Sequence, residues 1–429
     1  MKYTEMNKDE LALEYSKVKS DFENYKAMGL SLDISRGKPS KEQLDISLGL
    51  LSKQRTDSDC MSRDGFDCRN YGIAFGLPEI KDMWSDITGI PADNIIVGGN
   101  SSLNMMYDTL TRAMLYGVYG SERPWCREEK IKFLCPAPGY DRHFAVTESL
   151  GFELVLVHMT KDGPDMDEVE KYALDPTVKG IWCVPKYSNP TGITYSDEVV
   201  SRLAKMKTGA PDFRIMWDNA YIIHDLGGES DCLADIFAEA KKYGTEDRIF
   251  YFTSSSKITF PGSGVAMMAA SENNLKQMKP IIMTQTIGPD KLNQLRHVEF
   301  LKDKTGVMEH MRVHAKLLRK RFDIMLGALT RELDGKGIAE WTNPRGGYFI
   351  SLNVMRGCAK RVYELAKEAG VTLTTVGATF PYGIDPYDSN LRLAPSYPSC
   401  EELATASGIL ACTVKLAALE KLMKDKTSK

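Results

Sequence analysis

The stretch "YFTSSSKITFPGSG", residues 251–264, is typical of a buried β-strand that ends in three hydroxyls and one lysine, Lys257. A turn punctuated by glycine follows. Most lysines are solvated surface charges, and a serine cluster is often only a loop. The role of Lys257 must therefore be judged from the rest of the chain.

Short apolar runs of the same kind recur between helical stretches. They lie at 94–99, 131–136, 152–159, 180–185, 213–221, 248–257 and 264–271. Strands that alternate with helices predict an α/β fold around a mostly parallel sheet. We expect this large domain to span residues 50–295. The helix-rich remainder, residues 1–49 and 296–429, predicts a smaller α+β domain.

The composition of the 429 residues, 43% hydrophobic and 26% charged, is that of an ordinary globular protein. A net charge of −3 gives no field that would attract nucleic acid or an anionic membrane. The acidic N-terminus lacks the apolar segment of a signal peptide, and no window reaches the roughly 18 apolar residues of a spanning helix. We expect a cytoplasmic protein that binds small molecules and neither nucleic acid nor membrane.

Cysteines and histidines give no sign of a metal site. The nine cysteines form no CxxC pair, which favours reduced core thiols over disulfides or zinc ligands. His310 and His314 stand four apart on an expected helix, but no third ligand lies nearby. We therefore expect no metal.

Chemistry in a parallel α/β sheet is sought beyond the carboxyl ends of its strands. "IIVGGNSSL" ends in Gly99 and offers Asn100 and Ser101 where a helix begins, so free N–H groups could bind a phosphate, although a plain helix cap is the alternative. "CVPKYSNPTG" ends in a turn that could aim Asn189 into a cleft.

"IMWDNAYIIHDL" ends an apolar strand in Asp218, with Tyr221 three residues on. A carboxylate is costly in a core unless a cation meets it. Lysine, acid, amide, phenol and phosphate cradle are together what pyridoxal 5′-phosphate needs. Lysine forms a Schiff base with its aldehyde, the acid pairs with its pyridine nitrogen, and the cradle holds its phosphate.

Eight motifs in order now carry a resemblance: "NYGIAFGLPEIKDMW", "VGGNSSL", "PAPGYDRHF", "YSNPTG", "WDNAY", "SSSK", "PRGGYF" and "LRLAPS". Over essentially its whole length the chain resembles the class I pyridoxal-phosphate aminotransferases of the PLP-dependent transferase fold type I. It is most similar to a bacterial subgroup of aspartate aminotransferases that carries "SRGKPS" and "SSSKIT".

The resemblance implies a role for each matching residue. Lys257 would be the Schiff-base lysine and proton shuttle, Asp218 would face the pyridine nitrogen, and Asn189 and Tyr221 would bond the ring oxygen O3′. Tyr140 would stack on the ring. The phosphate would be held by Gly99, Asn100, Ser101 and Ser254, and by Tyr71 of a neighbouring subunit, which implies a homodimer.

Substrate recognition is also implied by the resemblance. Arg392 would grip the α-carboxylate through its planar fork, with an ordinary ion pair as the alternative, and Gly37 and Asn189 would border the substrate. The family usually has an arginine eight residues after the lysine, where this chain has Val265. The hydroxyl of Thr259 or Ser263, or a cation from elsewhere in the chain, would then help to bind the phosphate.

The implied reaction moves an amino group from an L-amino acid, expected to be aspartate, to a 2-oxo acid, expected to be 2-oxoglutarate. A dicarboxylate needs a second cation, for which Arg36 and Arg345 are the candidates. A pyridoxal-phosphate decarboxylase or lyase would use the same lysine and acid. A non-catalytic cofactor-binding regulator would need a basic DNA-binding segment ahead of the fold.

Overall fold

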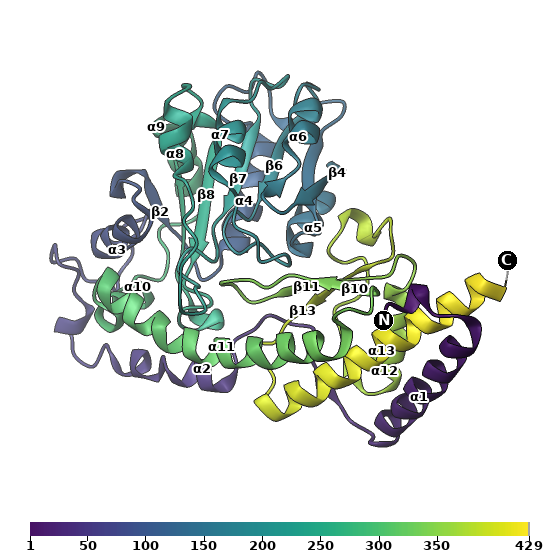
Figure 1. Ribbon diagram of the computed structural model, residues 1–429. Coiled ribbons are helices and arrows are strands. Elements are labelled where there is room, and N and C mark those ends of the chain that lie inside the picture. Colours follow the sequence, from purple (N-terminus) through teal and green to yellow (C-terminus); the bar gives the residue numbers. More distant parts are fainter. Residues whose placement is uncertain (428–429) are drawn as a thin grey trace.

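The computed structural model describes residues 1–427 and is built around an eight-stranded sheet (Figure 1). Every apolar run singled out above overlaps a strand of this sheet, which confirms the α/β prediction. Two strands, β9 (Ala266–Ala270) and the short β5 (Gly163–Pro164), run antiparallel to their neighbours. The order across the sheet is β2 (Ile95–Val97), β9 (Ala266–Ala270), β8 (Ile249–Ser254), β7 (Arg214–Asp218), β6 (Val178–Cys183), β3 (Lys132–Ala137), β4 (Glu153–Thr160), β5 (Gly163–Pro164).

Both faces of the sheet are covered by helices, because successive side chains of its strands point to opposite sides. In β7, Ile215 and Trp217 face one core, whereas Met216 faces the other. The first core is completed by α3 (Pro78–Thr88), α6 (Met166–Ala173), α7 (Asp197–Lys205) and α8 (Ile236–Lys241). The second is completed by α4 (Ser102–Tyr116), α5 (Asp141–Ser149) and α9 (Glu272–Gln285).

The rest of the chain forms a second group of elements beside the carboxyl ends of these strands. It contains the antiparallel strands β10 (Ala339–Trp341), β11 (Ile350–Val354) and β13 (Asn390–Leu393) and the parallel pair β1 (Leu32–Asp33) and β12 (Val371–Thr372). Its helices are α1 (Lys8–Ala27), α2 (Lys41–Asp45), α12 (Ala359–Glu368) and α13 (Cys400–Thr427).

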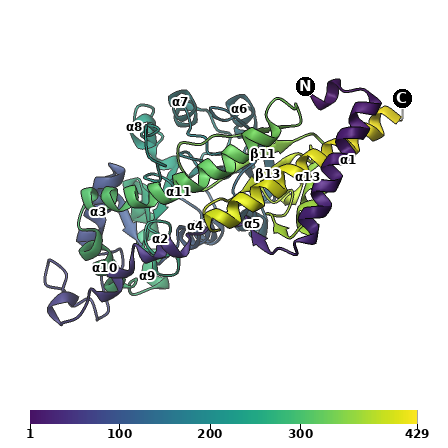
Figure 2. The same ribbon diagram turned by 60° about the horizontal axis from the view of Figure 1, so that its bottom comes forward.

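One long helix, α11 (Lys304–Leu333), connects the two groups. It follows α10 (Lys291–Leu301) and buries Val307 and Met311 in the first core of the large sheet. Its later turns, from Leu318 to Leu333, are buried in a separate core that belongs to the second group of elements. Both α11 and α13 lie below the sheet in Figure 1, and Figure 2 shows the two helices side by side in front of it. Domain boundaries at residues 50 and 295 stay a prediction.

Helix α13 differs from the sequence expectation. Residues Cys400–Lys426 hold an 18-residue window of mean hydropathy 1.4, so by length and composition alone this helix could cross a membrane. In the fold, 72% of that window is buried. It packs against α1, α11 and α12, which explains its apolar character as that of a core helix.

The histidine pair in α11 is part of a buried polar network. His314 Nε2 lies 3.2 Å from His310 Nε2, and its Nδ1 lies 3.2 Å from Nε2 of Gln43, which also donates to the Tyr348 hydroxyl at 2.9 Å. No cluster of metal-ligating groups occurs within residues 1–427. Through these hydrogen bonds, the histidine pair connects α11 with α2 and with the segment before β11.

We predict that buried histidines make the fold acid-sensitive. Burial lowers the pKa of His314 and of His297 to about 4. Between pH 6.5 and 4 the unfolded chain binds protons that the folded chain does not, so stability is complete above pH 6.5 and is lost as pH falls. Between pH 7 and pH 5, each of the two histidines should lower the free energy of unfolding, measured in urea, by about 2 kcal/mol.

His314→Asn should remove its share of this pH dependence. His158→Asn is the matched control, because that histidine lies on the surface beside Glu168. A pH dependence in His314→Asn equal to that of the unchanged protein would contradict the assignment.

Candidate active site

The carboxyl ends of the parallel strands meet at a cavity of about 720 Å³. It is bounded by the turns after β6, β7 and β8, the start of α4 and the second group of elements. Most of the residues singled out from the sequence lie on its wall, namely Gly37, Ser101, Tyr140, Asn189, Asp218, Tyr221, Ser254, Lys257 and Arg392.

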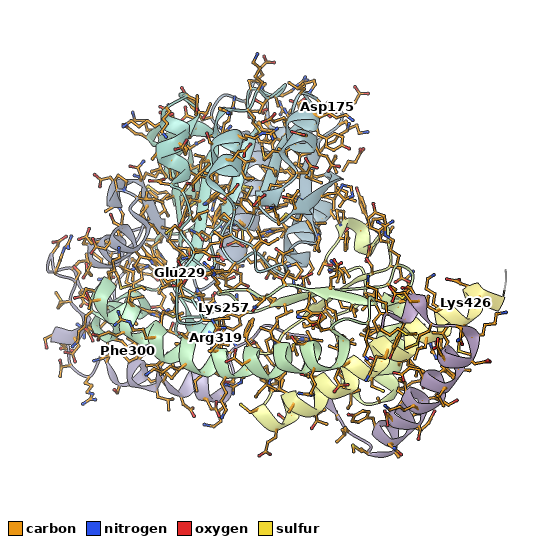
Figure 3. All side chains as sticks on the ribbon, in the orientation of Figure 1. Asp175, Glu229, Lys257, Phe300, Arg319 and Lys426 are labelled. Atoms are coloured by element: carbon orange, nitrogen blue, oxygen red, sulfur yellow. The ribbon has the colours of Figure 1, made fainter. Side chains whose placement is uncertain are left out.

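Lys257 lies in the turn that follows β8, near the middle of the molecule (Figure 3). The turn is fixed by Ser255, whose hydroxyl accepts from Val265 N at 2.9 Å. Lys257 Nζ lies 5.2 Å from the ring centroid of Tyr221 and 5.9 Å from that of Tyr348. Burial lowers the pKa of Lys257, and Asp218 partly opposes this. A buried amine of this kind is more readily neutral, and hence nucleophilic, than a surface lysine.

Asp218 ends β7 and is 3% exposed. His143 Nε2 lies 2.9 Å from its Oδ2, and the His143 ring stacks on Trp182 with centroids 4.1 Å apart. The other oxygen, Oδ1, is buried with no hydrogen-bond partner among the described residues. A buried carboxylate oxygen without a partner costs free energy unless a ligand donates to it.

The phenols on the wall are protonated donors at neutral pH. Burial raises the pKa of Tyr221 well above its ordinary value and that of Tyr140 to about 12. The Tyr221 hydroxyl has no hydrogen-bond partner among the described residues, so it is available to a ligand oxygen.

Free hydrogen-bond donors lie where α4 begins. Ser101 is its N-cap, yet its side chain makes no capping bond, and the first N–H groups of the helix have no intrahelical partner. Ser254 and Ser256 lie on the same wall with hydroxyls 3.0 Å apart. Gly99 and Asn100 line a second cavity of about 410 Å³.

Thr259 and Ser263 do not reach the cavity. The Thr259 hydroxyl lies 2.8 Å from His297 Nε2, and Ser263 donates to Asn293. Both hydroxyls are therefore committed to other groups. Ser102 and Ser256 are further hydroxyls on the cavity wall, although the Ser256 hydroxyl also donates to Asn100 O at 3.3 Å.

Arg392, on β13, is held at one nitrogen and on one face. Its Nη1 donates to Asp141 Oδ1 at 2.8 Å and lies 3.5 Å from Asn189 Oδ1, and its Cζ lies 5.1 Å from the ring centroid of Phe349. The same ring packs on Gly37, where an added Cβ would lie 2.3 Å from Phe349 Cζ. Glycine at position 37 thus allows the ring to lie between its backbone and Arg392.

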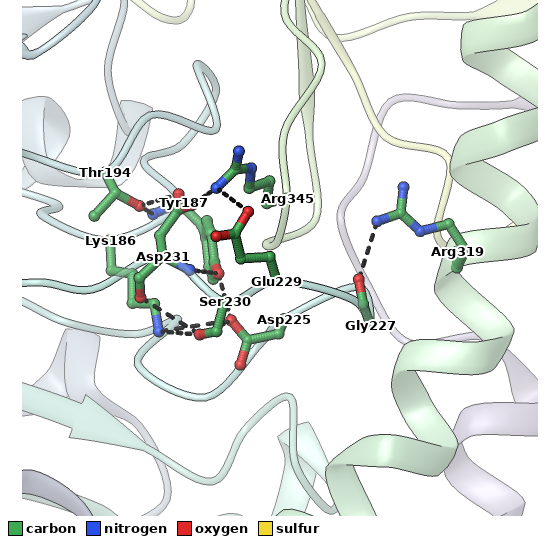
Figure 4. Close-up of polar contacts among 10 residues, drawn as sticks. All are labelled: Lys186, Tyr187, Thr194, Asp225, Gly227, Glu229, Ser230, Asp231, Arg319 and Arg345. Atoms are coloured by element: carbon green, nitrogen blue, oxygen red, sulfur yellow. Dashed lines mark hydrogen bonds and ion pairs between the residues drawn. The ribbon is translucent and has the colours of Figure 1, made fainter.

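The two candidate cations for a second carboxylate occupy different places. Arg36 lies on the cavity wall and its side chain has no hydrogen bond or ion pair within residues 1–427. Arg345 is off that wall, and its Nη1 lies 3.3 Å from Glu229 and 3.5 Å from Asp231 (Figure 4). Arg142 is a third cation, on the wall and likewise unpaired in this part of the chain.

Tyr71 is 78% exposed and is not on the cavity wall. It is therefore free to meet another molecule, but its contact with a neighbouring subunit stays a prediction.

Sequence reasoning missed Asp141, Arg142, His143, Ser256 and Phe349. His143 could have been found, because it lies three residues after Tyr140 and so shares one helix face with it. The contact of Asp141 with Arg392 spans 251 residues and leaves no local signal.

Comparison with known proteins agrees with this geometry. The family described as aspartate amino-transferase matches residues 6–426. The chain belongs to the aspartate aminotransferase family. An aspartate aminotransferase of Corynebacterium glutamicum is 45% identical over 96% of this chain and 95% of its own length.

Solved structures confirm the fold. The crystal structure of an aspartate transaminase from Corynebacterium glutamicum superposes with a TM-score of 0.96 at 44% identity, covering 98% of this chain and 99% of that one. The α-aminoadipate aminotransferase LysN of Thermus thermophilus was solved with N-(5′-phosphopyridoxyl)-L-leucine. It superposes with a TM-score of 0.74 at 22% identity, covering 91% of this chain and 93% of that one.

The protein is therefore a pyridoxal-phosphate-dependent aminotransferase of fold type I. The cavity fits this cofactor on three observations: the free buried oxygen of Asp218, the uncapped start of α4 and the buried amine of Lys257. Amino acids and 2-oxo acids are the substrates of such enzymes.

We predict that Gly37→Ala displaces the Phe349 ring. Overpacking of this kind costs about 1–3 kcal/mol, so the free energy of unfolding should fall by that amount. Gly99→Ala is the control, because an added Cβ there meets nothing within 4 Å. Equal unfolding midpoints for the two variants in urea would contradict the packing role of Gly37.

Proposed function

We propose that the protein is an aspartate aminotransferase that uses 2-oxoglutarate as acceptor. The observation that carries this proposal is the presence of two arginines on one cavity wall, Arg392 and Arg36. Arg392 would bind the α-carboxylate, which every amino acid has. Arg36, unpaired within the described chain, would bind the distal carboxylate, which only a dicarboxylic substrate has.

The residues around Lys257 support its role as the residue that bonds the cofactor. Its buried amine would hold the cofactor aldehyde and would act as the base that moves a proton at the substrate Cα. The free Oδ1 of Asp218 would hold the proton of the pyridine nitrogen. Tyr221 and Asn189 would donate to the ring oxygen. When bound, pyridoxal phosphate supplies the electron sink for the bonds at Cα.

The phosphate would lie against the start of α4, where Ser101, Ser254 and Ser256 provide hydroxyls. Gly99 and Asn100 would contribute backbone from the adjoining loop. Hydroxyls and helix N–H groups would then do the work that an arginine does in most of the family.

Tyr71 would complete this site from the neighbouring subunit of a homodimer, and its exposure supports the assignment. A cytoplasmic location stays a prediction of the sequence. A decarboxylase or lyase would use the same lysine and acid, and product analysis separates these reactions from transamination.

We predict that the purified holoenzyme is yellow and that borohydride fixes the cofactor to Lys257. The reason is that Lys257 is the lysine of the cavity wall whose amine lies over the Tyr221 ring. Peptide mapping after reduction should find the label on the fragment that contains Lys257. A label on Lys38, which lies on the same wall, would refute the assignment.

A second prediction concerns substrate choice. Arg36→Ala should lower kcat/KM for aspartate about 10- to 100-fold, the effect of removing one partner of a charged hydrogen bond. Alanine as donor should change less than about twofold, because it has no distal carboxylate. Arg345→Ala is the control and should leave both donors unaffected.

If Arg36→Ala slows aspartate and alanine equally, Arg36 does not read the distal carboxylate. Selectivity would then be sought at Arg142, which an Arg142→Ala variant tests in the same assay.

A further inference from the structure

Asp141 has no part in the predicted site, yet it makes the shortest contact of Arg392. Its Oδ1 accepts from Arg392 Nη1 at 2.8 Å, and 9% of the Arg392 side chain is exposed. An ion pair of this kind could be a structural tie between α5 and β13. It could also compete with a substrate carboxylate or prepare the guanidinium for it.

The remaining contacts of Arg392 favour the last alternative, in which Asp141 orients the guanidinium for a substrate carboxylate. Asn189 lies on the same nitrogen as Asp141, and Phe349 covers a face of the guanidinium. Nε is buried and has no partner among the described residues. The plane is thus fixed through Nη1 and one face, whereas the side that carries Nε is left for another acceptor.

That side is the one a carboxylate needs. A guanidinium binds a carboxylate best through two parallel N–H donors, and Nε with Nη2 forms such a pair. A ligand that used this pair would satisfy the buried Nε without displacing Asp141 from Nη1.

The position of Asp141 does not depend on Arg392 alone. Asp141 is the first residue of α5, where the helix dipole favours an anion, and 31% of its side chain is exposed. Two residues later His143 contacts Asp218. The position of Asp141 is therefore set by a helix that is anchored elsewhere.

We propose that Asp141 is a positioning residue that turns Arg392 so that its Nε side faces the α-carboxylate of the substrate. This rests on the proposed role of Arg392 in binding that group. The effect extends to every amino or oxo acid, because it concerns the carboxylate that they share. Asp141 thus sets affinity for the whole substrate class, whereas Arg36 discriminates within it.

The test uses the holoenzyme and the unreactive probes propionate and propionamide, which differ in the carboxylate. Asp141→Ala should weaken propionate about tenfold in titration calorimetry and leave propionamide unchanged. KM for aspartate and for alanine should rise by the same factor, with kcat within about threefold of the unchanged enzyme. Asp141→Asn, which keeps an oxygen acceptor, should recover most of the loss.

Glu420→Ala is the matched control, because it removes a carboxylate that Arg361 holds at 2.7 Å off the cavity wall. It should leave propionate binding unchanged. Asp141→Ser replaces the alanine variant if that protein fails to fold.

Three results would overturn the proposal. Tighter propionate binding in Asp141→Ala would show competition, and unchanged binding would show a structural ion pair. An asparagine variant no better than alanine would show that the acceptor oxygen is not what matters. Weakened propionate binding in a protein that transaminates nothing would instead refute the proposed function and leave the role of Asp141 standing.

Discussion

A carboxylate buried at the end of β7 sets the requirements for the rest of the site. Asp218 is almost fully enclosed, and a buried charge must be hydrogen-bonded on each oxygen or be neutralised. His143 serves one oxygen and is itself held flat against Trp182 of β6. The second oxygen remains for a donor from a ligand. The fold thus encloses half of an interaction whose other half the cofactor can supply.

The first turn of α5 extends this constraint to the substrate end of the cavity. Its position is fixed by His143 on Asp218, and the same turn carries Asp141 to Arg392 and places Arg142 on the wall. Helix α5 is packed in the second core through Phe144 and Val146. A shift of this helix would therefore disturb the groups at both ends of the cavity together.

The sequence predicted the parts of the site that depend on strand ends. Parallel strands bring their carboxyl ends to one edge, so Asp218, Ser254 and Lys257 could be placed together without knowledge of the strand order. The contact of Asp141 with Arg392 could not be foreseen, since the two residues lie 251 positions apart and no local pattern joins them. The role of α13 as a core helix could not be predicted either. Its hydropathy is high enough for a membrane span, and hydropathy alone does not distinguish burial in protein from burial in lipid.

The sequence could not distinguish the two candidate arginines, because their surroundings differ only in the fold. Both Arg36 and Arg345 stand beside a glycine, and nothing local separates them. In the fold, Arg345 meets Glu229 and Asp231, and Arg319 of α11 binds the backbone oxygens of Leu226 and Gly227 in the same loop. The charge of Arg345 is already compensated, whereas Arg36 and Arg142 face the cavity uncompensated within the described chain. A ligand with two carboxylates would satisfy Arg392 and one of these cations together, and a monocarboxylate would leave that cation without a counter-charge.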